Sequence, residues 1–172
     1  MILAAAIPYL IMLIIGFTGS AFWFPNCEIS LLAMANVEHV PEFKFLAWQI
    51  NLANYEAGML WLLGLMTAVG STFGSGFLYF MGRGALKVSK KVQAKIEKVD
   101  ITKFEKLGAA VLFTSSVSSI PPLTPLSFAA GIIKYDMLEY FLVTFAGKLI
   151  RFLIVVYASE GMVNFILGLK LF

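Results

Sequence analysis

The chain has 172 residues, of which 60% are hydrophobic, 15% are aromatic and 13% are charged. Soluble domains carry about 25% charged residues, so this composition excludes an ordinary soluble protein and predicts a polytopic membrane protein. A single cysteine and a single histidine exclude an internal disulfide and a cluster of metal-binding Cys and His residues, and we expect no metal and no cofactor.

The net charge of +3 conceals an asymmetry along the chain. Residues 83–106 contain eight basic and three acidic residues, whereas residues 25–56 contain four glutamates and one lysine. Cytoplasmic segments of membrane proteins are enriched in Lys and Arg. The basic segment is therefore predicted to be cytoplasmic, in a protein integral to the cell (plasma) membrane.

The first part of the chain predicts one transmembrane helix and one broken segment. Residues 1–24 carry no charge and lack the basic region of a signal peptide, so we predict a retained transmembrane helix there. Residues 25–51 are interrupted and too short to cross, which is typical of a re-entrant or interfacial hairpin. This segment begins with Pro25, after which Asn26 can cap a helix whose first turn holds Glu28.

The middle of the chain predicts a second transmembrane helix and a surface helix. Residues 57–82 have no charge, and Gly70 and Gly74 have the small-xxx-small spacing that lets another helix approach closely. Residues 83–106 separate apolar from basic positions at helical spacing, which favours an amphipathic helix on the anionic inner leaflet. The alternative is a solvated linker helix. The lysines expected to face the lipid are Lys87, Lys90, Lys91 and Lys98.

The last part contains the segment around which the chain is organised. Residues 107–133 form two apolar stretches separated by Pro121 and Pro122, each shorter than the ~20 residues needed to cross a bilayer. A broken apolar segment inside a membrane must line a cavity or be buried, so a second re-entrant hairpin is predicted. Thr124 is expected to be the N-cap of its second helix, with Pro125 in the first turn. Residues 137–159 predict a third transmembrane helix, and residues 161–172 a short C-terminal apolar segment.

Together these segments predict an all-α polytopic membrane protein in a single domain over residues 1–172. Two broken re-entrant hairpins, each followed by a transmembrane helix, form an inverted repeat, and a cytoplasmic amphipathic helix lies between the two units. Interrupted segments at matching positions of two halves are the best sequence indication of a binding site near the membrane midplane.

Charged and polar residues inside these apolar segments are the candidates for a substrate path. A carboxylate at membrane depth must be paired, protonated or exposed to water, so Glu28 is a candidate for proton coupling. Lys148 and Arg151 lie one turn apart in an apolar helix and could bind a phosphate, with a structural ion pair to Glu28 or Glu160 as the alternative. Further candidates are Arg83, which could equally be an interface anchor, and the polar cluster Ser115, Ser116, Ser118, Ser119 and Thr124.

Three motifs resemble the DedA/VTT family, also called SNARE-associated or DedA-like membrane proteins. They are Pro25-x-x-Glu28, Gly70-x-x-x-Gly74-x-x-x-x-Tyr79-x-x-Gly82-Arg83, and the proline break followed by Ala129-Ala130-Gly131, Phe141 and Gly147-x-x-x-Arg151. The resemblance covers roughly residues 20–155. It implies two facing re-entrant hairpins, lipid movement between leaflets (phospholipid or polyprenyl phosphate), and for Glu28 the role of the family's membrane-embedded acidic residue. Bacterial members usually have two arginines near the break, whereas residues 114–126 here carry no charge.

The sequence therefore predicts a lipid transporter working as a flippase or scramblase without nucleotide, with membrane lipids as partners and no nucleic acid. It leaves a homo-oligomer open. The alternatives are a non-transporting membrane scaffold that docks partners on its basic helix and, third, a membrane-embedded lipid hydrolase. We expect no enzyme, because the serine cluster contains no G-x-S-x-G elbow and no histidine at a fixed spacing from it.

Overall fold

The computed structural model describes all of the chain except residues 1, 23–25, 36–59, 89–100, 121 and 170–172. Its described secondary structure is entirely helical. The helices are α1 (Ile2–Phe22), α2 (Cys27–Ala35), α3 (Leu60–Val88), α5 (Ile101–Ser118), α6 (Leu123–Ile132) and α7 (Met137–Leu169). The all-α class predicted from the sequence is confirmed.

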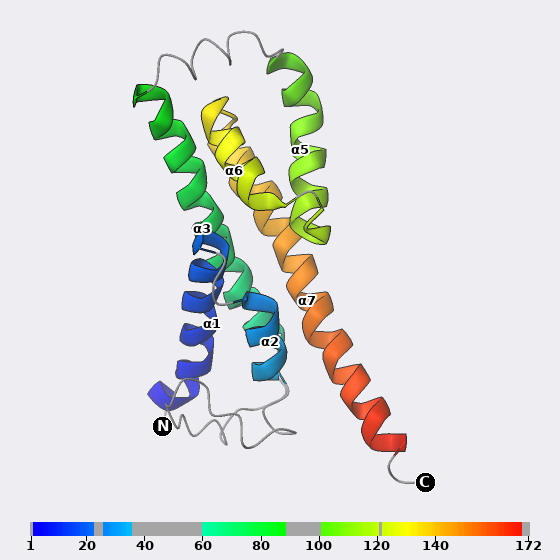
Figure 1. Ribbon diagram of the computed structural model, residues 1–172. Helices are drawn as coiled ribbons and strands as arrows, with labels where there is room; N and C mark the ends of the chain where they lie inside the picture. Colours follow the sequence, from blue (N-terminus) through cyan, green and yellow to red (C-terminus); the bar gives the residue numbers. More distant parts are fainter. Residues whose placement is uncertain (1, 23–25, 36–59, 89–100, 121, 170–172) are drawn as a thin grey trace.

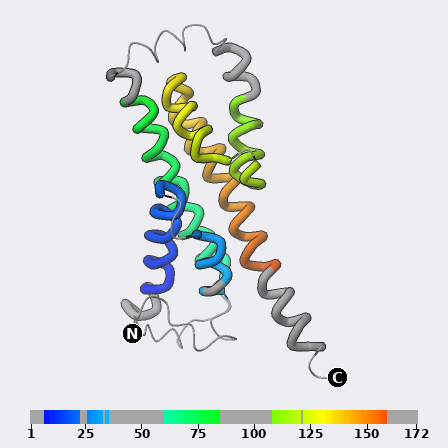
Figure 2. Tube along the Cα trace, viewed as in Figure 1, coloured from blue at the N-terminus to red at the C-terminus, as the bar shows by residue number. Residues whose placement is uncertain are grey.

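Two long helices, α3 and α7, lie side by side, and the four shorter helices pack against them. α3 and α7 run most of the length of the molecule (Figure 1). α1 starts at one end and stops near the middle, and α2 leads back toward that end. α5 and α6 do the same from the opposite end, so two helical hairpins approach the middle from opposite sides (Figure 2). α3 packs against α1, α6 and α7, while α7 also packs against α2 and α5.

Two of the helices are long and apolar enough to cross a membrane, Leu60–Gly84 and Met137–Ala158. The described apolar stretches of the others are shorter and comprise Ile7–Phe22 in α1, Gly108–Ser118 in α5 and Leu123–Ile132 in α6. A single crossing requires ~20 apolar residues. α1 itself has 21 residues, none of them charged, and covers residues 2–22 of the helix predicted over residues 1–24; its end lies near the middle of the molecule (Figure 1).

The distribution of polarity differs from that in a soluble protein. Many large apolar side chains point outward, including Leu10, Phe73, Ile120, Leu142 and Ile154. Beside two apolar clusters, the interior contains a set of buried polar side chains: Ser30, Thr67, Ser71, Thr72, Ser75, Ser115, Ser116, Ser127, Thr144 and Lys148. Exposed apolar surface together with buried polar groups is the informative deviation from ordinary burial. It fits a chain whose surroundings are lipid.

Glycines let neighbouring helices approach α3 at backbone distance. A Cβ atom at Gly70 would overlap the carbonyl of Leu13, and one at Gly74 would overlap the carbonyl of Phe17, both on α1. The close packing predicted from the small-xxx-small spacing of these glycines is confirmed. Where α3 meets α6, Gly82 approaches the carbonyl of Phe128 in the same way.

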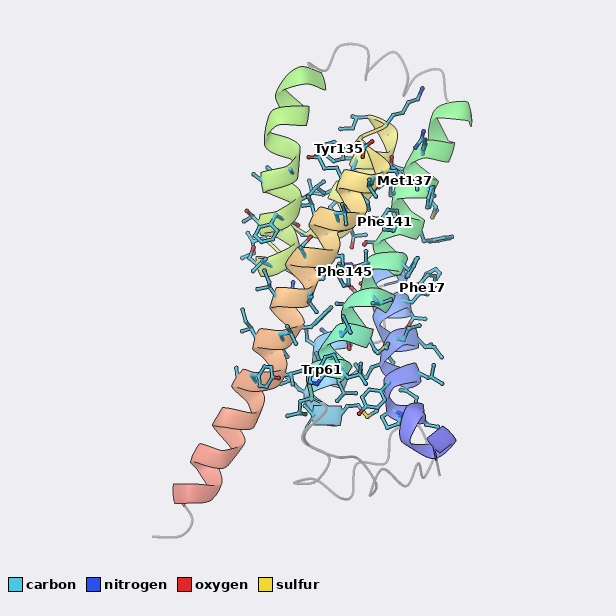
Figure 3. The ribbon with its side chains drawn as sticks, turned by 180° about the vertical axis from the view of Figure 1, so that it is seen from behind. Phe17, Trp61, Tyr135, Met137, Phe141 and Phe145 are labelled. Atoms are coloured by element: carbon cyan, nitrogen blue, oxygen red, sulfur yellow. The ribbon has the colours of Figure 1, made fainter. Side chains whose placement is uncertain are left out.

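The other glycines of the sequence motifs also lie at helix contacts. Gly131 on α6 approaches the carbonyl of Tyr79, and Gly147 on α7 lies against Ser116 of α5. The labelled Phe141 on α7 (Figure 3) lies against Gly76 of α3. The glycines of these motifs are therefore packing positions.

The predicted break between α5 and α6 is present. α5 ends at Ser118, and Ser119 adopts a left-handed conformation with φ of 59°. Its amide donates to the carbonyl of Ser115 at 2.8 Å, which is the αL type of helix C-cap. The N-cap of α6 is Pro122 and its first residue is Leu123, so the helix starts two residues before the start expected with Thr124 as the N-cap. Pro121 lies outside the described residues.

Other predicted boundaries shift or lie outside the described residues. α7 continues without interruption to Leu169, so the separate segment expected over 161–172 is, as far as Leu169, part of the same helix. Residues 83–88 belong to α3 instead of starting the amphipathic helix. The rest of that helix over 89–100, with Lys90, Lys91 and Lys98, lies outside the described residues, as do Pro25 and residues 36–51 of the first broken segment.

The end of α6 yields a stability prediction. Lys134 has a φ of 58°, and the amides of Lys134 and Tyr135 donate to the carbonyls of Gly131 at 3.2 Å and Ala130 at 3.0 Å, which is a Schellman cap. The left-handed conformation costs a non-glycine residue roughly 1 kcal/mol. Lys134→Gly should therefore raise the midpoint of thermal unfolding in detergent micelles, whereas Lys134→Ala should not. Equal midpoints for the two variants would contradict this explanation.

Candidate functional site

A polar cavity of about 350 Å³ lies where the two hairpins meet α3 and α7. Every described helix contributes to its wall. The lining residues are Gly19, Ser20, Asn26, Cys27, Glu28, Ser71, Ser75, Ser115, Ser116, Ser119, Pro122, Leu123, Thr124, Lys148, Arg151 and Phe152. The charged groups among them are one carboxylate, one ammonium and one guanidinium.

Arg151 joins the ends of both hairpins to α7. Its guanidinium forms an ion pair with Glu28 in the first turn of α2. The same group donates a hydrogen bond to the hydroxyl of Ser119 at the break between α5 and α6. The side chains of Arg151 and Glu28 are 22% and 33% exposed, so the pair is accessible at the cavity.

Lys148 lies one turn before Arg151 and is only 5% exposed. Its ammonium group donates to the carbonyl of Ser71 at 2.5 Å and to the hydroxyl of Ser75 at 3.0 Å, both on α3. The hydroxyl of Ser71 also bonds that of Ser20 on α1. A buried charge is expensive unless it is hydrogen-bonded, so this polar chain across α1, α3 and α7 holds the cation inside the protein.

The start of α2 is fixed by Asn26. Its side-chain oxygen accepts from the amides of Glu28 at 2.9 Å and Ile29 at 3.3 Å, which confirms the predicted N-cap. This cap places Glu28 at the positive end of the helix dipole, where a carboxylate is favoured. Leu123 and Thr124 open α6 on the same cavity, so two helix N-termini face it.

The structure brings together most of the candidate residues predicted from the sequence. Those that line the cavity are Glu28, Ser115, Ser116, Ser119, Thr124, Lys148 and Arg151. Of the two sequence readings of Arg151, a phosphate contact or an ion pair with Glu28, the ion pair is present. Arg151 also lines the cavity while it forms this ion pair.

Two candidates are not among the lining residues. Ser118 is exposed, and its hydroxyl donates to the carbonyl of Thr114 at 2.8 Å. Arg83 is exposed near the other end of α3, where it donates to the hydroxyl of Tyr79 at 3.3 Å. Tyr79 itself is buried, and its hydroxyl donates to the carbonyl of Tyr135 at 2.5 Å. Arg83 therefore bonds a tyrosine that joins α3 to the turn between α6 and α7.

A pair of stacked tyrosines separates that end of the molecule from the cavity. The rings of Tyr79 on α3 and Tyr140 on α7 lie 4.8 Å apart. Tyr140 is fully buried and donates from its hydroxyl to the carbonyl of Ser75 at 3.1 Å. Ser75 therefore links this aromatic pair to Lys148.

Sequence reasoning missed Ser20, Ser71, Ser75 and Cys27 as lining residues. Isolated serines in apolar helices ordinarily bond their own backbone and give no distinctive pattern. One usable signal is present, because Ser71 and Ser75 are four residues apart and each follows a glycine of the close-packed face of α3. In the described part of the chain, no group of three His, Cys, Asp or Glu side chains could hold a metal ion.

Comparison with known families identifies most of the chain. The family model of the VTT domain matches residues 50–161, which is more than half of the sequence and includes α3, α5, α6 and the first part of α7. Glu28 and the rest of the first hairpin precede the matched region. No curated protein and no solved structure matches the chain. With two described helices long and apolar enough to cross a membrane, the chain is an integral membrane protein that belongs to the VTT domain family, the DedA/SNARE-associated family.

Proposed function

We propose that this protein moves lipids with a phosphate-bearing headgroup between the two leaflets of a membrane. The observation that carries the proposal is the polar cavity between the hairpins, where Lys148 and Arg151 supply two cations within one turn of α7. The headgroup passes through this cavity while its acyl chains remain in the bilayer. Membership of a family often linked to lipid transport agrees with this.

In this proposal α1–α2 and α5–α6 are re-entrant hairpins that enter the bilayer from opposite leaflets. Both end near the middle of α3 and α7 (Figure 1). α2 has only 9 residues, and the apolar stretches of α5 and α6, Gly108–Ser118 and Leu123–Ile132, are too short to cross. Irregular backbone at membrane depth is tolerated only where it is buried or lines a cavity. α1 then acts as the first arm of a hairpin instead of a separate transmembrane helix, and α1–α3 and α5–α7 form the inverted repeat.

The chemistry of the cavity suits a phosphate. Removing an anion from water is unfavourable unless the protein replaces its hydration. Lys148, Arg151 and the positive N-terminal ends of α2 and α6 supply that replacement. A volume of about 350 Å³ is at the lower end of the range for small-molecule sites, and it fits a headgroup better than acyl chains.

The proposal also covers the orientation of the protein in the membrane and its coupling to a proton gradient. The end of the molecule between α3 and α5 faces the cytoplasm of a plasma-membrane protein, since residues 83–106 are basic. The lysines of this segment, with Lys87, Lys90, Lys91 and Lys98 among them, then bind anionic inner-leaflet lipid. Protonation of Glu28 would break its ion pair with Arg151, so a proton gradient could act on transport at this ion pair. The mechanism uses no nucleotide and no covalent catalysis.

Reconstitution into vesicles tests the proposal. Vesicles with a fluorescent phospholipid are treated with dithionite, which destroys the fluorescence of the outer leaflet only. Active protein should expose the inner-leaflet signal to dithionite, whereas protein-free vesicles should retain it. Retention of that signal in sealed vesicles with folded protein would favour a scaffold, and release of a product from the lipid would favour a hydrolase.

A further inference from the structure

The ion pair between Glu28 and Arg151 occupies the position where a phosphate would be bound. Arg151 is the more accessible cation of the cavity, and its planar guanidinium binds carboxylates and phosphates with the same paired geometry. Lys148 is buried, and the partners that the structure gives it, Ser71 and Ser75, are uncharged. The cavity therefore holds one cation that is already neutralised and one that is not.

The same ion pair joins α2 to α7, in addition to the apolar cluster in which Leu31 of α2 packs with Phe152 and Val156 of α7. Glu28 is fixed to the start of α2 by the Asn26 cap, and Arg151 belongs to the long helix α7. The contact therefore holds the end of the first hairpin against α7. An anion that replaces Glu28 on Arg151 removes this contact, while the bond from Arg151 to Ser119 still holds the second hairpin.

We propose that Glu28 is an internal competitor for the anion, so that the Glu28–Arg151 ion pair is a latch that a phosphate group opens by taking the place of the carboxylate on Arg151. Lys148 is the fixed cation that attracts the phosphate, and Arg151 is the exchangeable one. The inference rests on the proposed function and adds its regulation. The empty protein remains closed by its own carboxylate, and the headgroup itself opens the first hairpin.

The latch makes a quantitative prediction for anion affinity. When only a fraction of the molecules can bind, the apparent Kd exceeds the intrinsic Kd by the inverse of that fraction. A latch that is closed about nine-tenths of the time thus weakens binding about tenfold, and removing the carboxylate should restore that factor. A purely structural ion pair predicts the opposite, because its loss disturbs the cavity and weakens binding.

The test measures binding separately from transport. The full-length protein in detergent is titrated with sodium phosphate and, in parallel, with dihexanoylphosphatidylglycerol, at constant ionic strength, and the thermal unfolding midpoint is followed by tryptophan fluorescence. Glu28→Gln, with Glu28→Ala as a second variant, should lower the apparent Kd about tenfold, and Arg151→Gln should abolish the stabilisation. Glu139→Gln is the matched control, because it removes an exposed carboxylate from the first turn of α7, outside the cavity.

The outcomes separate the latch from the transport proposal. A lower Kd in both Glu28 variants supports the latch, and the probe with the larger effect identifies the source of the phosphate as a lipid headgroup or a free anion. An unchanged or higher Kd in both variants, with lipid movement by the wild type intact, overturns the latch and leaves the proposed function standing. Absence of anion binding together with absence of lipid movement overturns both.

Discussion

Replacing Arg151 by alanine should reduce protein-dependent lipid movement by about ten- to a hundredfold. The guanidinium contacts the ends of both hairpins and lines the cavity, so its loss removes a charged hydrogen-bonding group from the path of the headgroup. A hydrogen bond to a charged group contributes about 1.5–3 kcal/mol, and each 1.4 kcal/mol changes a rate about tenfold. The measurement is the initial rate of inner-leaflet quenching in vesicles with equal amounts of folded protein.

Two further variants establish the cause of the loss. Arg151→Lys should retain an intermediate rate, because lysine keeps the charge but cannot bind two oxygens in the planar arrangement of a guanidinium. Lys134→Gln removes an exposed cation at the end of α6, away from the cavity, and should leave the rate unchanged. A wild-type rate in Arg151→Ala would exclude Arg151 from the headgroup path.

Lys148→Met should abolish most lipid movement while leaving the fold at least as stable as the wild type. Replacing a buried charge with an apolar side chain of similar volume is often neutral or stabilising. Of the two acceptors left behind, the hydroxyl of Ser75 still donates to the carbonyl of Thr72 at 3.0 Å, and the carbonyl of Ser71 belongs to the helical backbone of α3. The phosphate, by contrast, loses its fixed cation, and we expect a decrease in rate of at least about tenfold.

This role of Lys148 requires that the substitution lowers the rate of lipid movement without lowering the stability of the fold. Thermal unfolding in detergent reports the stability, and dithionite quenching in vesicles reports the rate. A variant with a lower unfolding midpoint and a proportionally lower rate would mean that Lys148 only joins α3 to α7. A stable variant with full activity would mean that the headgroup does not meet this cation.

The features that local chemistry determines were predicted well from the sequence. The prolines at 121 and 122 cannot continue a helix, and α5 ends at Ser118 before them. Gly70 and Gly74 lack the side chains that would hold α1 away, and the two backbones meet there. Asn26 has the side chain that an N-cap requires, and it caps α2.

The features that depend on tertiary packing were not predicted. Nothing in the local pattern distinguishes Ser71 and Ser75 from serines that bond only their own helix, because their role depends on Lys148, more than seventy residues later in the chain. α7 continues past Glu160, since a charged residue at a membrane surface need not end a helix. The place of the end of α1, near the middle of the molecule, could not be read from its apolar run, because it depends on how α1 packs against α3.

The proposed function requires that the ends of the two hairpins meet inside the membrane around a cavity open to water. Reaction with a small, charged, membrane-impermeant methanethiosulfonate reagent in sealed vesicles reports whether this cavity admits water. Native Cys27 at the start of α2 and a Thr124→Cys substitution in a Cys27→Ser background should both react, because both positions line the cavity. A Leu142→Cys substitution in the same background should not react, because Leu142 is exposed on the outer face of the apolar helix α7, which the proposal places in lipid. Equal reactivity at all three positions, or none at the two cavity positions, would contradict the account.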